Sequence, residues 1–549
     1  MATEHKGFEQ IFDQIGGLGR RQLAIFLAIN MGDFVTGWTM LGPVFFSAVP
    51  QWLCPQMNRT LNRTDHLSEL DDLYGNGTND SSAIILDTCN SDGGMCPGIQ
   101  YVSDFTSIVS EWNLICNLKY IGDLITTIQM VGVVLGALII SQLADTFGRK
   151  PVWYATITFN GVVGFANAFA PLWEVFAAMR FFNGLCAGGL LIVNFVWALE
   201  FTGTKYRTIN GAVTFWQISI MTLTLIAYFV RQWKTFVMIT SLAPPVVLWL
   251  FFRFLPESPR WLAMHDRLDE AKETIDAIAR SNKKPAPDMI ALQKAIDEEK
   301  RRSAHESKYS FWDLFRTPLL TRYTLILMFV WFVQAAMYYG LSLNVRNLPG
   351  DIYINTVLLA LVDWPATAST AYLNNKIGRR PTMFMFMLIG GLAVFSVMFV
   401  GVAGKLETMG TLVTVLALLG KLGVSAAWVV SYLYTAELYP TVVRSIACGA
   451  ASISGRIGGV AAPQFAYLSS VALELPFIIF GSFALAAAFL GLLLPETNRQ
   501  ALLDALPDWA WCGRQNRHSD FDDQNPDDVM KYGAVENPNV SKGNENTRL

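Results

Sequence analysis

Long apolar runs separated by short polar connections dominate this chain of 549 residues. An α-helix needs about 20 apolar residues to cross the hydrocarbon core of a bilayer, and runs of about that length recur along the sequence. The first six lie near 22–48, 121–143, 152–171, 175–200, 209–230 and 235–255. The second six lie near 321–343, 352–374, 382–403, 408–433, 443–470 and 474–495. The pattern predicts an all-α membrane protein with 12 transmembrane helices in two six-helix bundles.

Polar segments set the expected domain limits. We predict an N-terminal segment at 1–20, a first bundle at 21–255, a linker at 256–320, a second bundle at 321–495 and a tail at 496–549. The first apolar run is too long for a signal-peptide core, so we expect it to remain as a spanning helix. The linker shows the spacing of short amphipathic helices, broken by Pro285 and Pro287. The polar tail has almost no aliphatic periodicity, which predicts disorder.

Three short motifs occur in the same order in both halves. DTFGRKP at 145–151 returns as NKIGRRP at 375–381, EFTGTKYR at 200–207 returns as ELYPTVVR at 437–444, and Pro256-Glu257 returns as Pro495-Glu496. Self-similarity at a long period indicates a duplicated architecture. Two homologous halves in an apolar chain are typical of membrane transporters.

Composition supports the membrane class and excludes others. Hydrophobic residues make up 52% of the chain and charged residues only 15%, whereas a soluble domain carries about 25% charged residues. A net charge of −3 without a concentrated basic tract gives no basis for nucleic-acid binding. The five histidines lie outside the predicted spans and the chain has no phosphate-binding loop, so we predict no enzymatic activity, no cofactor and no metal.

The distribution of basic residues predicts the orientation in the membrane. Lysines and arginines fall on alternate connections, for example Arg149 with Lys150 and Arg379 with Arg380. The positive-inside rule places these connections and both termini in the cytoplasm, and the loop at 49–120 outside. That loop holds four glycosylation sequons, at Asn58, Asn62, Asn76 and Asn79.

Four cysteines lie in the same outer loop: Cys54, Cys89, Cys96 and Cys116. On the oxidising side of a membrane they would form two disulfides, and three pairings are open. A zinc site is the alternative. The spacings disfavour it, because zinc sites usually contain closely spaced cysteine pairs.

Several segments together resemble one known family. DTFGRKP at 145–151, PESPRWL at 256–262, YYGLSLNV at 338–345, YTAELYPTVVR at 434–444 and LLPET at 493–497 are similar to the organic ion transporters of the major facilitator superfamily, the solute carrier family 22 type. This family includes organic cation, organic anion and carnitine transporters. The resemblance implies two six-helix bundles in the plasma membrane, around a central cavity that opens alternately to either side.

The repeated charged motifs are candidate gates. Gly148 permits a tight reversal of the backbone, and Asp145 and Arg149 can bridge to a neighbouring helix end. A solvated loop whose charges only set topology is the alternative. The family resemblance favours a gate, although Asn375 replaces the usual Asp of the second copy, so we expect the second gate to be weaker. The candidate gating residues are Asp145, Gly148, Arg149, Glu200, Arg207, Gly378, Arg379, Glu437 and Arg444.

Charged residues inside the predicted spans point to a substrate site. A charge at mid-membrane costs about 3 kcal/mol, so Asp33, Asp363, Lys421 and Arg456 each need a partner or a wet cavity. In the family, the position of Arg456 carries Asp in typical cation transporters and Arg in anion and carnitine-type ones. A guanidinium can bind a carboxylate through two parallel hydrogen bonds. Thr367 stands where anion transporters usually have Lys, and an ion pair of Arg456 with Asp363 or Asp33 is the structural alternative.

Aromatic residues complete the candidate site. Trp331, Tyr338 and Tyr339 match cavity positions of the family, and Trp216 and Phe34 are further candidates. Their rings can hold a quaternary ammonium group, although ordinary packing explains any one of them equally well. Two acids and two bases leave the embedded set neutral, which suits a zwitterion such as carnitine.

We therefore predict transport of small organic anions or zwitterions. An organic cation carrier that uses Asp33 or Asp363 is one alternative, and a membrane receptor that binds a ligand without transporting it is another. The final tripeptide Thr547-Arg548-Leu549 is similar to a PDZ-domain ligand, so a PDZ protein is a candidate partner.

Overall fold

The computed structural model describes residues 8–55, 84–86, 89, 95, 99–203, 215–306, 310–405 and 408–498. Contacts divide the chain into Met1–Asp504 and Ala505–Leu549, and all described residues belong to the first unit. The four sequons, Cys96, Arg207 and Thr547–Leu549 lie outside the described residues.

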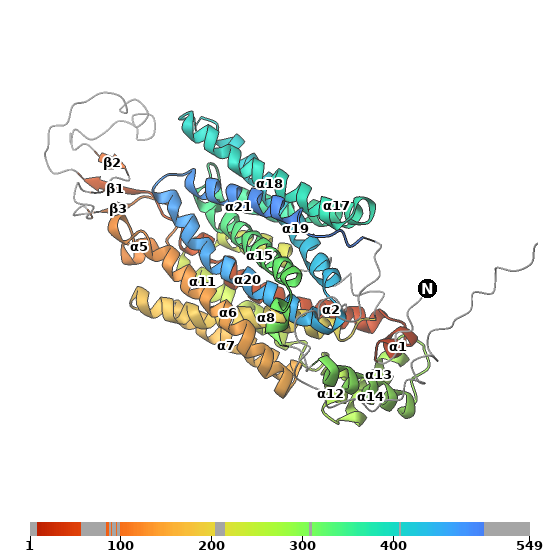
Figure 1. The fold of residues 1–549 in the computed structure, drawn as a ribbon. Helices are drawn as coiled ribbons and strands as arrows, with labels where there is room; N and C mark the ends of the chain where they lie inside the picture. The colour runs from red at the N-terminus through yellow and green to blue at the C-terminus, as the bar shows by residue number, and fades with distance from the viewer. Residues whose placement is uncertain are drawn as a thin grey trace, which may run out of the picture. The chain divides into compact units, whose positions relative to one another are not determined.

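The first half is built from long helices (Figure 1). They are α2 (Arg20–Asn30), α3 (Gly32–Leu41), α4 (Pro43–Phe46), α6 (Ile121–Phe147), α7 (Arg149–Asn167), α8 (Trp173–Leu199), α10 (Trp216–Phe229) and α11 (Trp233–Trp249). The first predicted span is thus divided into three segments. Gly32 lies at the first break, where a Cβ would approach Asn194 Oδ1 to 2.6 Å, so the close packing of this segment requires glycine.

The second half repeats this plan. Its helices are α15 (Pro318–Leu343), α16 (Ile352–Leu361), α17 (Asp363–Ile377), α18 (Arg379–Val402), α19 (Gly410–Leu438), α20 (Thr441–Tyr467) and α21 (Leu475–Gly491). Pro365 explains the break between α16 and α17, because it has no N–H to donate to the carbonyl group of Leu361. Asp363 therefore lies in the first turn of a new helix.

Helices α1 (Phe8–Gln14), α12 (Pro259–Met264), α13 (Leu268–Ser281) and α14 (Met289–Glu306) gather at one end of the long helices (Figure 1). Helix α13 ends at Ser281 and α14 begins at Met289, so Pro285 and Pro287 lie between two helices. Phe12 of α1, Phe26 of α2 and Ile275 of α13 belong to one buried hydrophobic cluster, which attaches the linker to the first half.

The opposite end carries a small antiparallel sheet that the sequence did not predict. Its strands β1 (Trp52–Pro55), β2 (Ile84–Leu86) and β3 (Gln100–Tyr101) are ordered β2-β1-β3. The short helix α5 (Ile108–Trp112) follows in the same loop.

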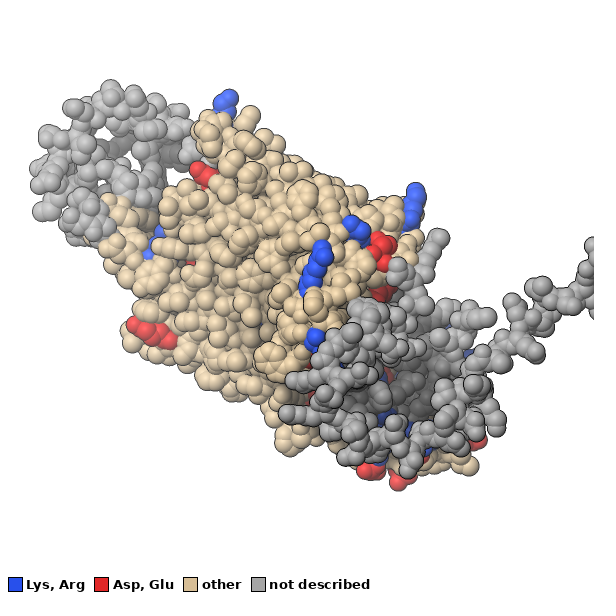
Figure 2. Space-filling view, viewed as in Figure 1, with Lys and Arg blue, Asp and Glu red and all other residues tan. Residues whose placement is uncertain are grey.

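Every one of the predicted apolar runs contains helix in the structure. Within the described residues, six helical stretches are long and apolar enough to cross a membrane: Arg20–Phe46, Cys116–Phe147, Trp173–Leu199, Pro318–Asn347, Arg379–Val402 and Gly410–Leu438. Figure 2 shows a broad uncharged belt on the face in view, with charged side chains toward its two ends. This distribution is expected of a surface that faces hydrocarbon.

Candidate functional site

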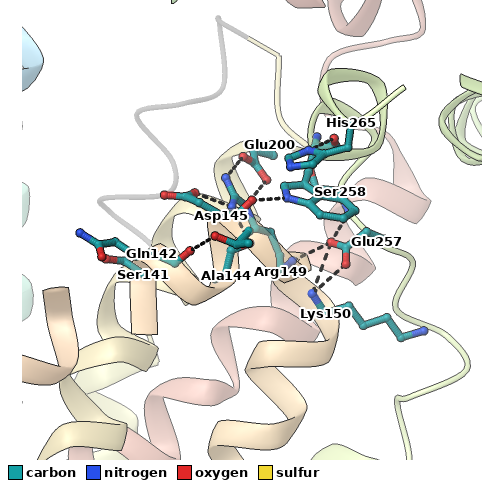
Figure 3. A network of polar contacts seen from close by, with 12 residues as sticks. Ser141, Gln142, Ala144, Asp145, Arg149, Lys150, Glu200, Glu257, Ser258 and His265 are labelled. Atoms are coloured by element: carbon teal, nitrogen blue, oxygen red, sulfur yellow. Dashed lines mark hydrogen bonds and ion pairs between the residues drawn. The ribbon is translucent and has the colours of Figure 1, made fainter. Parts of the chain in front are cut away.

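The first copies of the three repeated motifs meet in one charged cluster (Figure 3). Arg149, the first residue of α7, donates from Nη2 to Glu200 Oε1 at 3.1 Å and from Nη1 to Asp145 Oδ1 at 2.5 Å. The side chains of Arg149 and Glu200 are 11% and 9% exposed, whereas that of Asp145 is 68% exposed. The Glu200 pair is thus shielded, and water screens the Asp145 pair.

Glu257, from the third motif, caps the N-terminus of α7. Its carboxylate accepts hydrogen bonds from the backbone N–H groups of Arg149, at 3.0 Å, and Lys150, at 3.2 Å. Burial raises the pKa of the Glu257 carboxyl group, and these hydrogen bonds oppose that rise. Gly148 has a φ of 106°, and a Cβ there would lie 2.5 Å from Glu257 Oε2. The turn therefore requires glycine.

Trp261 is a second residue of the linker that contacts this turn. Trp261 donates from Nε1 to the backbone oxygen of Asp145 at 2.7 Å and stacks on His265 with ring centroids 4.2 Å apart. Movement of the turn between α6 and α7 would therefore be transmitted to α12.

The second copies form an equivalent cluster. Arg379 donates from Nη2 to Glu437 Oε1 at 2.9 Å, and its backbone N–H donates to Glu496 Oε1 at 2.9 Å. Arg380 N–H donates to Glu496 Oε2 at 3.0 Å. Gly378 has a φ of 102°, and a Cβ would lie 2.8 Å from the Glu496 carboxylate. Each glycine, arginine and pair of glutamates thus has a counterpart in the other half.

The two clusters differ where the sequence repeat differs. Asn375 donates to the backbone oxygen of Ala371, and Arg379 Nη1 donates instead to Asn498 Oδ1 at 2.7 Å. A neutral amide thus takes the place that Asp145 holds in the first cluster. That the second gate is weaker stays a prediction.

Arg444 does not join its expected cluster. It donates from Nε to the backbone oxygen of Tyr439 at 3.4 Å rather than to Glu437. Its Nη2 is buried and has no hydrogen-bond partner within the part of the chain that the structure describes. We therefore correct the expectation that Arg444 belongs to the charged cluster around Arg379. The first turn of α20 holds the arginine against the preceding carbonyl group.

A chain of hydrogen bonds in the interior connects the two halves. Asp363 accepts from Tyr338 Oη at 3.0 Å and from Ser425 Oγ at 2.5 Å, and Tyr338 Oη accepts from Trp216 Nε1 at 2.9 Å. Trp216 belongs to the first half and the other three residues belong to the second. The hydroxyl groups of Tyr338 and Ser425 therefore each donate a hydrogen bond to the Asp363 carboxylate.

Lys421 lies beside this chain. It is 2% exposed, donates from Nζ to Ser342 Oγ at 2.7 Å, and has Nζ 2.9 Å from the centroid of the Tyr338 ring. One face of Tyr338 thus holds an ammonium group from the protein itself. Lys421 thus contacts the ring of Tyr338, and Asp363 contacts its hydroxyl group.

Asp33 remains within the first half. It accepts from Asn194 Nδ2 at 3.5 Å, and Asn194 Oδ1 accepts a short hydrogen bond from Trp153 Nε1. The neighbouring Phe34 ring lies 5.9 Å from the ring of Phe215 between centroids. The structure does not bring Asp33 to Lys421 or Arg456.

Arg456 lies in the middle of α20 and is half-buried. Its Nη1 donates to the backbone and hydroxyl oxygens of Ser452, one turn earlier in the same helix. Its Nε is buried and lacks a hydrogen-bond partner among the described residues. Within the described part of the chain, Arg456 forms no ion pair with Asp363 or Asp33, so the structural alternative is not observed. Two of the predicted aromatic residues lie near Arg456, because Trp331 packs against Gly455 and Tyr339 against Gly459 of the same helix.

The predicted aromatic residues of α15 join two that the prediction missed. Trp331 lies 4.4 Å from Tyr432 and 6.0 Å from Trp428 between ring centroids, and Tyr338 lies 5.9 Å from Trp428 and 5.4 Å from Tyr339. Trp428 and Tyr432 are four apart in one apolar run, so they share a helix face, and this spacing could have identified them. The five residues form one aromatic cluster beside Arg456.

Arg180 is a buried charge that the prediction also missed. It is 4% exposed, donates from Nε to Gln129 Oε1 at 2.9 Å and from Nη2 to the backbone oxygen of Thr39 at 2.9 Å, and lies over the ring of Phe46. A lone arginine inside the run at 175–200 was the available signal. Its contacts connect α8 with α6, α3 and α4, which indicates a structural role.

An ion pair joins the halves at the helix ends nearest the strands. Arg346 Nη2 forms a short ion pair with Asp123 Oδ1, and Arg346 Nη1 donates to the backbone oxygen of Ser47 at 3.5 Å. The side chains of Arg346 and Asp123 are 11% and 10% exposed. Nearby, Phe45 of the first half stacks on Tyr353 of the second with centroids 5.9 Å apart. No sequence pattern signals this ion pair, because its members lie in different halves and outside the repeats.

One disulfide of the loop at 49–120 is defined. Cys89 and Cys116 are bonded, with their Cα atoms 5.8 Å apart. This bond excludes a zinc site made by all four loop cysteines. The backbone of Cys54 lies in β1 and Cys96 is outside the described residues, so a second disulfide stays a prediction.

Comparison with known proteins identifies the family. The model of the family "Sugar (and other) transporter" matches residues 92–509. "Solute carrier family 22 member 15-like" of Xenopus tropicalis is 36% identical over 74% of this chain and 82% of that protein. "Organic cation transporter protein" of Drosophila melanogaster is 31% identical over 93% and 95%, and "Solute carrier family 22 member 13" of Homo sapiens is 30% identical over 91% and 93%. The chain belongs to solute carrier family 22 of the major facilitator superfamily.

Solved structures confirm the fold of this solute carrier. The inward-open conformation of the xylose transporter XylE from E. coli matches with a TM-score of 0.61 at 15% identity, covering 88% of this chain and 98% of that one. At this identity the likeness concerns the fold alone. The predicted major facilitator fold is confirmed, and the helices found in all predicted spans agree with two six-helix bundles. The protein is therefore a membrane-embedded transporter.

Proposed function

We propose that the protein transports small organic anions or zwitterions, such as carnitine-like solutes, across the plasma membrane by alternating access. The main support for this proposal is the incomplete hydrogen bonding of the Arg456 guanidinium. Its hydrogen bonds to described residues stay within its own helix, and its Nε is buried without a partner among them. A guanidinium inside a membrane span is costly unless a counter-charge or water reaches it. The carboxylate of a bound solute would supply that charge in a bidentate geometry.

The aromatic cluster supports a second subsite for a cationic group. Trp331 and Tyr339 pack against Gly455 and Gly459, which lie beside Arg456 in α20, and Trp428 contacts Tyr338 in the same cluster. The contact of Lys421 with Tyr338 supports this assignment, because an ammonium group already uses one of these rings. A zwitterion would then place its carboxylate at Arg456 and its ammonium group among the rings.

The contacts between the halves support an inward-facing arrangement. The ion pair of Arg346 with Asp123 joins the halves near the strands, in the region assigned to the outside by the basic-residue pattern. The clusters around Arg149 and Arg379 each lie within one half. Opening the outer side would break the first contact.

An organic cation carrier is the second candidate. It is favoured by Asp363, a 2% exposed carboxylate that contacts the ring carrying Lys421. A relative from Drosophila melanogaster bears the name "Organic cation transporter protein". In that case the substrate would replace Lys421 at Tyr338.

Uptake by cells distinguishes these functions. Carnitine, benzoate and tetraethylammonium are offered to cells that express wild type, Arg456→Gln or Arg456→Lys, and surface expression is measured for each. We expect saturable uptake of carnitine or benzoate by wild type. Loss of a charged hydrogen bond of about 3 kcal/mol predicts a reduction on the order of 100-fold in Arg456→Gln, with partial recovery in Arg456→Lys.

Two results contradict the proposal in different ways. Uptake of tetraethylammonium alone, at equal rates in wild type and Arg456→Gln, would identify a cation carrier. Saturable binding of a ligand without its entry into sealed vesicles, and without acceleration by unlabelled ligand on the far side, would identify a receptor.

A further inference from the structure

An apolar groove lies between α7 and α11, away from Arg456 and its aromatic cluster. Its volume is about 520 Å³, and its lining includes Tyr154, Ala155, Phe159, Val162, Trp249 and Phe252. The volume falls within the range of about 300–1,000 Å³ that is typical of small-molecule sites. Phe159 is 48% exposed and Val162 is 61% exposed, so the groove presents an apolar surface that lipid can cover.

The groove has a preformed wall. Trp249 donates from Nε1 to Thr158 Oγ1 at 2.9 Å, stacks on Phe252 with centroids 5.1 Å apart, and packs against Tyr154 at 5.0 Å. The only polar atom of the indole is thus satisfied within the protein. The wall that remains is suited to a hydrocarbon chain rather than to a polar solute.

A positive charge marks one end of the groove. Lys150 Nζ lies 4.4 Å from the centroid of the Phe252 ring. Figure 3 shows the Lys150 side chain pointing away from the Arg149 cluster, whose Glu257 is engaged by backbone N–H groups. Arg253, next to Phe252, is exposed. The basic end of the groove coincides with the end of α7 that the basic-residue pattern assigns to the cytoplasm.

We propose that this groove binds an anionic phospholipid of the cytoplasmic leaflet, with an acyl chain along Trp249 and Val162 and the headgroup at Lys150. Charge complementarity selects this occupant, because the cytoplasmic leaflet is rich in anionic lipids and basic pockets between helices hold their headgroups. A lipid without net charge would satisfy the groove wall but would leave the charge of Lys150 unbalanced.

Native mass spectrometry of the full-length protein in detergent tests the site, with phosphatidylserine and phosphatidylcholine of the same chain length. We expect wild type to retain phosphatidylserine more strongly. Lys150→Gln should reduce that retention about fivefold, the factor that one basic residue contributes near a membrane surface. Ala155→Phe fills the groove and should reduce the retention of both lipids.

Two variants in the second half serve as controls: Arg380→Gln changes the matching position of the repeat, and Ala371→Phe adds a ring to an exposed helix position.

Several outcomes overturn the site. Equal retention of the two lipids in wild type would remove the headgroup selection, and preferential retention of a sterol would identify a different occupant. An equal loss in Lys150→Gln and Arg380→Gln would show general electrostatic attraction. If Lys150→Gln does not fold, unchanged retention in Ala155→Phe alone rejects the groove. The readout needs no substrate, so its failure leaves the proposed transport function unaffected.

Discussion

Gly148 and Gly378 show what the repeat preserves at the level of single residues. Both have φ above 100°, and both leave no room for a Cβ because a glutamate carboxylate from a later motif lies against them. The shared backbone reversal is what allows Glu257 and Glu496 to reach the N–H groups of α7 and α18. The glycine and the glutamate of each half therefore depend on each other.

Gly148→Ala should destabilise the protein by about 1–3 kcal/mol from the backbone strain alone, because φ 106° with ψ 154° is a conformation that essentially only glycine adopts, and further from displacement of Glu257. Gly404→Ala is the matched control, because Gly404 has a φ of 65° but no atom within 4 Å of the position that a Cβ would take. Thermal unfolding in detergent should show the larger loss for Gly148→Ala. An equal loss in both variants would mean that the glutamate adjusts without cost.

At the level of elements, charged groups at helix ends distinguish the two halves. Glu257 and Glu496 cap α7 and α18 in the same way, but Arg149 also binds a carboxylate one turn back in α6, whereas Arg379 binds the amide of Asn498. The turn between α6 and α7 is thus held by one more ion pair than the turn between α17 and α18.

Asp145→Ala and Asn375→Asp should shift the conformational equilibrium in opposite directions. We expect Asp145→Ala to favour inward-facing states, because it removes a pair that holds the turn between α6 and α7, at the end that the basic residues assign to the cytoplasm. Asn375→Asp places a carboxylate four residues before Arg379 and should favour outward-facing states. Since Asp145 is 68% exposed, each shift should be at most about 1 kcal/mol, or about fivefold in population.

A cysteine probe in the outer part of the cavity, labelled with a membrane-impermeant maleimide, measures this shift. Ser141→Ala is a suitable control, because Ser141 bonds only to carbonyl groups of its own helix among the described residues. Unchanged labelling rates in both test variants would reject the gate and leave the charges with a role in topology alone.

The sequence predicts helices and paired clusters far better than it predicts contacts between the halves. Arg149 with Glu200 and Arg379 with Glu437 were predicted because duplication marks both members of each pair. The aromatic cluster was predicted in part, since Trp331 and Tyr338 share a face of α15 while Trp428 comes from another helix. The pair of Asp123 with Arg346 could not be predicted, because tertiary packing alone brings these two residues together.

On the scale of the whole molecule, this buried pair should control opening near the strands. Removal of one partner from a buried ion pair costs about 3–5 kcal/mol, because the other charge is left desolvated. That cost falls on the state in which the halves touch here, since separation returns Arg346 to water. Asp123→Ala should therefore shift the population toward outward-facing states and increase the labelling rate of the outer cysteine probe.

The reversed pair Asp123→Arg with Arg346→Asp separates charge pairing from shape. If the ion pair holds the halves together, each single reversal should place like charges together and open the outer side, and the double reversal should restore labelling toward the wild-type rate. Arg231→Asp is a control for general loss of basic charge, because Arg231 pairs with Asp104 at the exposed surface of the first half. If the double variant is labelled as fast as the single variants, charge pairing does not hold the halves together. Side-chain shape, including the contact with Ser47, would then hold this side closed.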